Sequence, residues 1–178
     1  GQAEIAFNSD TNEYWVAYGV TLSGGDTANE DDRIMWSRFD SQTFEQVGEP
    51  VQLSQTRIGR NAVASAHIAY DSDSKAAVAV WLERGREGTT AGAWGRTLYP
   101  EGRLGDEFPV LTANTFPYSE GYAPSTLTYN PFTGTLFMSA GDWDGGAEAV
   151  ELDYLGSIYN QDQVIAPDGN LGTFNVAQ

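Results

Sequence analysis

The sequence predicts an all-β fold in which one unit is repeated three times. A strand, a polar turn and a second strand occupy residues 5–18 and return, with altered side chains, at 68–81 and 127–140. Matching aromatic positions in the three copies are Phe7, Tyr70 and Tyr129. The apolar residues alternate as in half-buried strands, and no segment predicts a helix. A period of about sixty residues divides the single domain, 1–178, into units of 3–57, 58–117 and 118–178.

Each unit is expected to contain four antiparallel strands. In the first unit, residues 4–8 alternate so that Ile5 and Phe7 share one apolar face. Aromatic and β-branched residues predict the next strands. The four predicted strands of this unit are 4–8, 13–20, 33–39 and 51–53. Residues 21–32 are acidic and contain two glycines, so they predict a loop.

The later units follow the same plan. In the second, Trp94-Gly95-Arg96 aligns with Trp36-Ser37-Arg38 of the first, and Pro100-Glu101-Gly102 predicts a turn. Its predicted strands are 66–70, 76–82, 91–98 and 107–111. The third unit has predicted strands at 125–129, 135–140 and 148–152, followed by a longer excursion and a closing strand within 171–176.

Four short antiparallel strands at this period are typical of a β-propeller blade. The strand end Ala79-Val80-Trp81, the motif Trp94-Gly95-Arg96 and the later Pro-x-Gly turn resemble the propeller-type repeats of large secreted bacterial surface and adhesion proteins. The resemblance covers all three units. It is clearest in the first two, because the third has Ala140 in place of Trp81 and an insertion before its last strand. It implies an extracellular or cell-surface binding role.

Three blades are too few to close a propeller, which typically has four to eight. A two-fold homodimer could complete a six-bladed ring, and this solution is favoured because two-fold dimers are the commonest closed assemblies. Further repeats of a longer chain, or a different β architecture, would also cover the end blades. The opening Gly1-Gln2 fits a domain taken from a longer chain.

Composition excludes several classes of function. The chain has 25 acidic and 9 basic residues and a formal net charge of −16, which disfavours nucleic acid and anionic membranes. There is no cysteine for a disulfide or a thiolate metal site, and no apolar run long enough for membrane insertion. The acid excess fits either a protein of high-salt surroundings or an extracellular protein kept soluble by charge.

One acidic cluster lies in the predicted loop of the first unit. Asp26, Glu30, Asp31 and Asp32 offer the oxygen ligands that calcium prefers. The second pair of acids, Asp142 and Asp144, lacks the spacing of an EF-hand loop. Calcium is therefore a possible cofactor, and solvated surface charge is the simpler interpretation.

The best predicted ligand-binding residues lie in the loops between second and third strands. Trp143, flanked by Asp142 and Asp144, could stack on a sugar ring while the carboxylates accept hydroxyl protons. Arg84 and Arg86 lie in the corresponding loop of the second unit. In a propeller these loops share one rim, which we expect to be the working surface. The other tryptophans fall on strands and are expected in the core: Trp15, Trp36, Trp81 and Trp94.

No catalytic motif stands out. His67 is the only histidine, and a buried hydrogen-bonding role explains it better than metal binding or acyl transfer. The sequence favours a non-catalytic extracellular module that binds carbohydrate or another surface partner. The alternatives are a structural subunit that assembles into a surface layer or filament through open strand edges, and a propeller-type glycoside hydrolase or lyase.

Overall fold

The computed structural model describes residues 3–22, 31–54, 66–83, 92–111, 123–141, 147–152, 162–165 and 171–174. Within these ranges the chain forms antiparallel strands in three sheets, and its only helical element is one 3₁₀ turn at Pro100–Gly102. No helix of this part of the chain is long and apolar enough to cross a membrane. The predicted all-β class is confirmed.

The first two sheets each have four strands in sequence order. Those of the first sheet are β1 (Ala3–Asn8), β2 (Glu13–Leu22), β3 (Asp31–Asp40) and β4 (Val51–Gln52). Those of the second are β5 (Ala66–Asp71), β6 (Ala76–Glu83), β7 (Gly92–Leu98) and β8 (Leu104–Leu111). Aromatic and β-branched residues drive these strands, as the sequence predicts.

The third sheet has five strands, one more than predicted. Its strands are β9 (Ala123–Asn130), β10 (Thr135–Gly141), β11 (Ala147–Leu152), β12 (Asp162–Ile165) and β13 (Leu171–Phe174). The additional strand β12 lies in the excursion that the sequence left without a strand, and it pairs with both β11 and β13.

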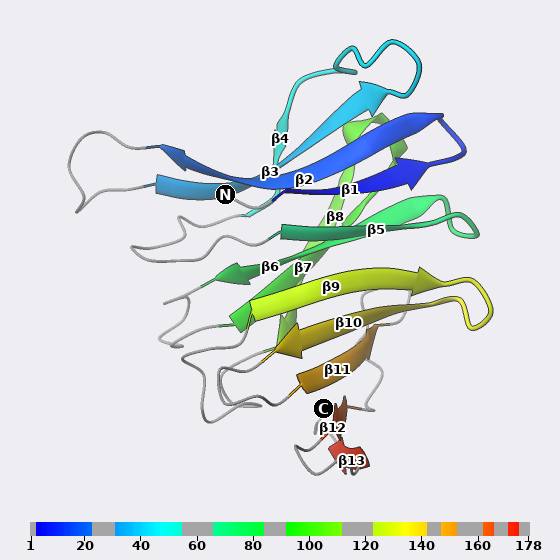
Figure 1. The fold of residues 1–178 in the computed structure, drawn as a ribbon. Coiled ribbons are helices and arrows are strands. Elements are labelled where there is room, and N and C mark those ends of the chain that lie inside the picture. The colour runs from blue at the N-terminus through cyan, green and yellow to red at the C-terminus, as the bar shows by residue number, and fades with distance from the viewer. Residues whose placement is uncertain are drawn as a thin grey trace.

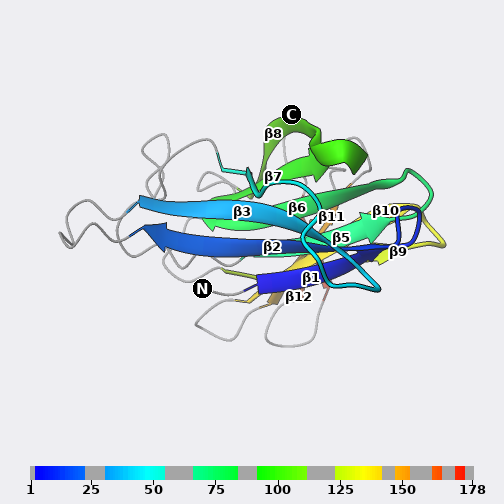
Figure 2. The same ribbon diagram turned by 90° about the horizontal axis from the view of Figure 1, so that it is seen from above.

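The three sheets stack in chain order, so the second lies between the first and the third (Figure 1). The hairpins β1–β2, β5–β6 and β9–β10 all turn at the same end of this stack, which both views show (Figures 1 and 2). Strand β5 contacts both β1 and β9, so the first strands of the units are neighbours. The second sheet therefore presents one face to the first unit and the other to the third.

Two apolar cores fill the spaces between the sheets. In the first core, Trp15 and Trp36 of the first sheet pack with Trp81 and Trp94 of the second. The rings of Trp15 and Trp36 meet edge to face at 4.9 Å. The second core joins the second and third sheets, with Val78, Val80, Leu136 and Met138 among its members. The prediction that the four strand tryptophans form the core is confirmed.

The predicted apolar face of β1 is wrong in one respect. Ala6 and Asn8 point into the first core or are buried beside it, whereas Ile5 is 61% exposed and Phe7 is 47% exposed. Side chains alternate along a strand, so burial of Ala6 and Asn8 directs Ile5 and Phe7 to the opposite face. In the second and third units the corresponding face packs against the unit before it.

The alignment of Trp94-Gly95-Arg96 with Trp36-Ser37-Arg38 is also wrong by one residue. Trp36 lies opposite Ala17, whereas Trp94 lies opposite Trp81, the residue one position further along the repeat. A shift of one residue changes the face of the sheet, so these tryptophans enter the same core from facing sheets. Gly95 takes the ladder position of Trp36, and a Cβ there would lie 2.7 Å from the Phe108 ring.

The hairpin turns share one device. Asn8, Asp71 and Asn130 each end a first strand, and a side-chain oxygen accepts a backbone N–H from the residue two positions on. The last turn residue has a positive φ in all three hairpins: 57° at Asn12, 59° at Lys75 and 68° at Gly134. The predicted turns between first and second strands are confirmed.

Replacing Trp81 with alanine tests the first core. The side chain is fully buried between two sheets, so Trp81→Ala should lower the free energy of unfolding by about 3–5 kcal/mol. Denaturant unfolding followed by fluorescence or circular dichroism measures this loss. The control Gln42→Ala changes an exposed turn residue and should cost less than about 0.5 kcal/mol. Equal effects of the two substitutions would contradict this core.

Candidate functional site

Most residues predicted to bind a ligand or a metal lie outside the described residues. They are Arg84, Arg86, Asp142, Trp143, Asp144, Asp26 and Glu30. Asp31 and Asp32 lie in β3 instead of in the predicted loop, where their backbones pair with Leu22 and Thr21. The strand thus begins two residues earlier than predicted.

The strands that flank the predicted binding loops end on the same side of the molecule. Strands β2, β6 and β10 finish at Leu22, Glu83 and Gly141, at the end of the stack opposite the three hairpins (Figure 1). The connections to β3, β7 and β11 therefore leave from a common end. Placement of Trp143 and the arginines on one working surface stays a prediction.

Within the described ranges, no three histidine, cysteine or carboxylate side chains are grouped to hold a metal ion. His67 joins the first two units: its Nδ1 lies 2.7 Å from Oε2 of Glu4, and the backbone N–H of Ile68 donates to the same oxygen at 3.2 Å. The imidazole is buried, and its Nε2 has no hydrogen-bond partner among the residues that the structure describes. A buried hydrogen-bonding role is thus what the structure gives His67.

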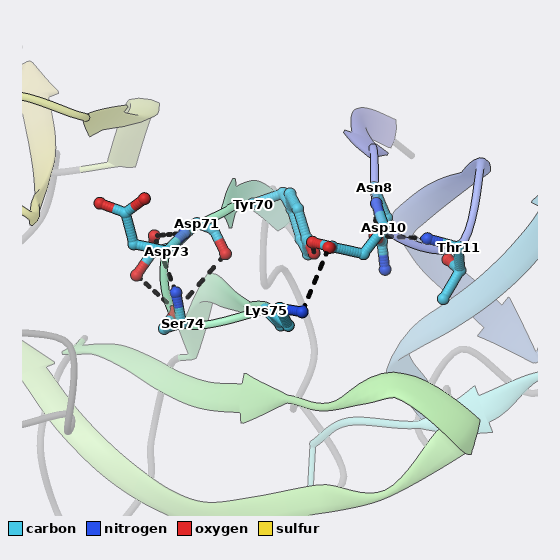
Figure 3. Close-up of polar contacts among 8 residues, drawn as sticks. All are labelled: Asn8, Asp10, Thr11, Tyr70, Asp71, Asp73, Ser74 and Lys75. Atoms are coloured by element: carbon cyan, nitrogen blue, oxygen red, sulfur yellow. Dashed lines mark hydrogen bonds and ion pairs between the residues drawn. The ribbon is translucent and has the colours of Figure 1, made fainter.

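The hairpin end of the stack carries polar contacts between neighbouring units (Figure 3). Asp10, in the β1–β2 turn, accepts a hydrogen bond from the Tyr70 hydroxyl of the second unit. Lys75 Nζ of the second unit lies 3.6 Å from the same carboxylate. One aspartate of the first turn therefore meets two groups of the next unit.

The same contact recurs between the second and third units. The hydroxyl of Tyr129 donates to Oδ2 of Asp73 at 3.0 Å. Asp73 holds the turn position of Asp10, and Tyr129 holds the strand position of Tyr70. The first and second units thus each use an aspartate of their hairpin to bind a tyrosine of the following unit. Repeat alignment matches the tyrosines in the sequence, but their partners come from the tertiary structure.

The phenol of Tyr129 is perturbed by this contact. Its pKa is raised well above the ordinary value of 10.0, mainly because partial burial disfavours the charged phenolate. The hydrogen bonds to Asp71 and Asp73 and the negative charges of these two residues raise it further. The neutral hydroxyl is therefore the form that the folded chain prefers. The neutral hydroxyl donates a hydrogen bond to the Asp73 carboxylate, which a phenolate could not do.

The most distinctive surface is the open face of the first sheet, formed by Ile5, Phe7, Tyr14, Val16, Tyr18 and Phe44. Cross-strand pairing places Val16 opposite Ile5 and Tyr14 opposite Phe7 on β1 and β2. The Tyr14 ring lies 5.5 Å from Phe7 and stacks on Phe44 at 6.3 Å. Phe44 is 70% exposed. Several aromatic rings thus form one apolar surface; of its residues, the sequence predicts only Ile5 and Phe7 on a shared apolar face.

Among the described residues, a second exposed surface lies on the far face of the third sheet, formed by Thr126, Thr128, Phe137 and Ser139 with Phe132 in the adjoining turn. Phe137 is 42% exposed and Phe132 is 97% exposed. Thr128 lies opposite Phe137 and Thr126 opposite Ser139, so the four strand residues share a face. This surface is less apolar than the open face of the first sheet.

Comparison with models of known protein families and with curated proteins finds no match to this sequence. The resemblance to propeller-type repeats of secreted bacterial proteins therefore stays a prediction from the motifs.

Titration of Tyr129 tests the contact with Asp73. A tyrosine whose pKa is raised on folding stabilises the native state below the unfolded pKa of about 10, and this stabilisation is lost as pH rises through the folded pKa. The absorbance of phenolate, measured against pH, counts the tyrosines that ionise at each pH. We expect Tyr129→Phe to have one fewer tyrosine that ionises only at high pH than the wild type has. Asp73→Asn should shift the late titration to lower pH, and an unchanged titration in both variants would contradict the contact.

Proposed function

We propose that the chain is a non-catalytic binding module of an extracellular or cell-surface protein. In this proposal the three units are blades of the β-propeller type, and the open face of the first sheet is the surface that binds a partner. The observation that carries the proposal is the exposure of this face at positions that are buried in the later units.

The repeat itself supports a binding role. Ile68, which matches Ile5, is 3% exposed, and Leu127, at the same position of the third unit, is 4% exposed. Both are covered by the unit before them. A soluble chain rarely leaves a large contiguous apolar patch uncovered unless that patch has a partner. The absence of a metal-binding group from the described ranges is compatible with this role but does not carry it.

A second candidate function is carbohydrate binding at the opposite end of the stack. The common origin of the β2–β3, β6–β7 and β10–β11 connections favours it, because ligand sites are often built from loops that a rigid scaffold brings together. Trp143 would stack on a sugar ring, with Asp142 and Asp144 as hydroxyl acceptors. Calcium bound through Asp26 and Glu30 is compatible with either function.

The open face is tested with an apolar dye. Dilute protein should bind anilinonaphthalene sulfonate (ANS), which becomes fluorescent on exposed apolar surface. The double variant Ile5→Ser/Phe44→Ser should lose most of this fluorescence, because it removes two of the exposed side chains. Gln42→Ser alters an exposed polar residue near Phe44 and should leave it unchanged. Weak fluorescence in the wild type, or equal signals in all three proteins, would argue against a binding surface here.

The carbohydrate candidate is tested with a glycan array. If the loop end binds sugars, the wild type should bind at least one glycan class, and Trp143→Ala should weaken this binding by about tenfold or more, because a stacked ring contributes on the order of 1–2 kcal/mol. Phe44→Ala lies on the other proposed surface and serves as the matched aromatic control. Glycan binding that survives Trp143→Ala would exclude this residue as the contact.

A further inference from the structure

We propose that the partner of the open face of the first sheet is the far face of the third sheet in a second copy of this chain. Copies then associate head to tail. This inference rests on the proposed binding role of the open face and names its partner. Three features of the described residues point to a second copy: the internal junctions, the hairpin residues and the side-chain sizes.

The internal junctions show what normally covers each face. The second sheet covers the far face of the first with Ala66, Ile68, Ala77, Ala79 and Trp81. The third sheet covers the far face of the second with Leu127, Leu136 and Met138, which hold the same strand positions. In the first sheet these positions are Ile5, Tyr14 and Val16 of the open face. Their natural complement is therefore the far face of another unit of this repeat.

The tyrosine and aspartate that meet at each internal junction are both replaced by phenylalanine at the two outer faces. At both internal junctions an aspartate of one turn accepts from a tyrosine of the next unit: Asp10 from Tyr70, and Asp73 from Tyr129. The remaining tyrosine position holds Phe7, and the remaining aspartate position holds Phe132. Phe132 donates its backbone N–H to Asn130 Oδ1 at 3.0 Å, just as Asp10 donates to Asn8.

This double change fits a junction between copies. If the third unit of one copy covers the first unit of the other, Phe132 approaches Phe7 as Asp10 approaches Tyr70. Two phenyl rings then replace a hydroxyl and a carboxylate, so neither residue is left as an unpaired polar group. A carboxylate at position 132 would instead face a ring that cannot donate to it. It would also add to the net charge of −16 that opposes association.

Side-chain sizes also follow the pattern of the internal junctions. The first core sets Trp15 of one sheet with Ala77 and Ala79 of the next, and the second core sets Val78 and Val80 with Leu136 and Met138. In each core apolar side chains of the two facing sheets share the space. Phe137 and Ser139 hold the positions of Trp15 and Ala17 in the third sheet, and they would complement Tyr14 and Val16 of the open face.

Two head-to-tail contacts related by a two-fold axis would close a ring of six units. A ring of six lies within the range of closed propellers, whereas three units do not close. Head-to-tail contacts end in a ring when their rotation closes. The expected particle therefore has twice the mass of the chain.

Sedimentation equilibrium of the purified chain over a wide concentration range tests the assembly. The wild type should be a dimer that dissociates on dilution. Phe132→Asp should weaken the dimer by about tenfold or more, because the carboxylate would be buried against Phe7 without a donor. Adding Phe7→Tyr to Phe132→Asp should recover much of the affinity, since it recreates the Tyr–Asp pair of the internal junctions. Ser72→Asp adds the same charge to the second hairpin and should have little effect.

Circular dichroism of each variant checks that the sheets are retained, and Phe132 is so exposed that its replacement should not unfold the chain. A monomer at every concentration would overturn the inference, as would a dimer that Phe132→Asp and the double variant leave unchanged. If the monomer still binds ANS through Ile5 and Phe44, the open face has a different partner and the proposed binding function survives. If the dye does not bind and no dimer forms, both proposals fail.

Discussion

The two-sided character of the sheets is the constraint on which the rest of the structure depends. A half-buried sheet needs one apolar face, but the second sheet is apolar on both, with Ile68 and Trp81 toward the first unit and Val78 and Val80 toward the third. Such a sheet is stable only between two neighbours. The stack of three units follows from this requirement. The open face of the first sheet and the far face of the third sheet stay exposed, because no further unit of the described chain covers them.

Polar contacts fix the position of each unit relative to its neighbour. Tryptophan and aliphatic packing is strong but tolerates sliding, whereas the contacts of Asp10 with Tyr70 and of Asp73 with Tyr129 require a defined position. Both use a hairpin that an Asx turn holds in shape. The partly buried pair of His67 and Glu4 adds a further contact between the first two units. Apolar burial thus supplies the stability, and these few polar contacts give the stacking its register.

The pattern of covered faces stops at the open face of the first sheet, and our proposal for the function starts from this observation. The corresponding face is buried in the second and third units and exposed in the first. The surface that covers it in the later units indicates what kind of partner the open face would bind. Strands β2, β6 and β10 finish at the opposite end of the stack, away from the three hairpins. The proposed assembly surface and the proposed carbohydrate site therefore use different parts of the chain.

Much of the fold was determined by the sequence alone. Alternation and turn residues identified the all-β class, the three hairpins and the four buried tryptophans, because strand periodicity and turn chemistry act over a few residues. Only the tertiary structure decided which face of each strand is covered. Ile5 and Ala6 are both apolar, so alternation could not say which meets a neighbour, and a one-residue difference in pairing separates Trp36 from Trp94. The Tyr–Asp contacts likewise join residues of different units, which no local pattern can show.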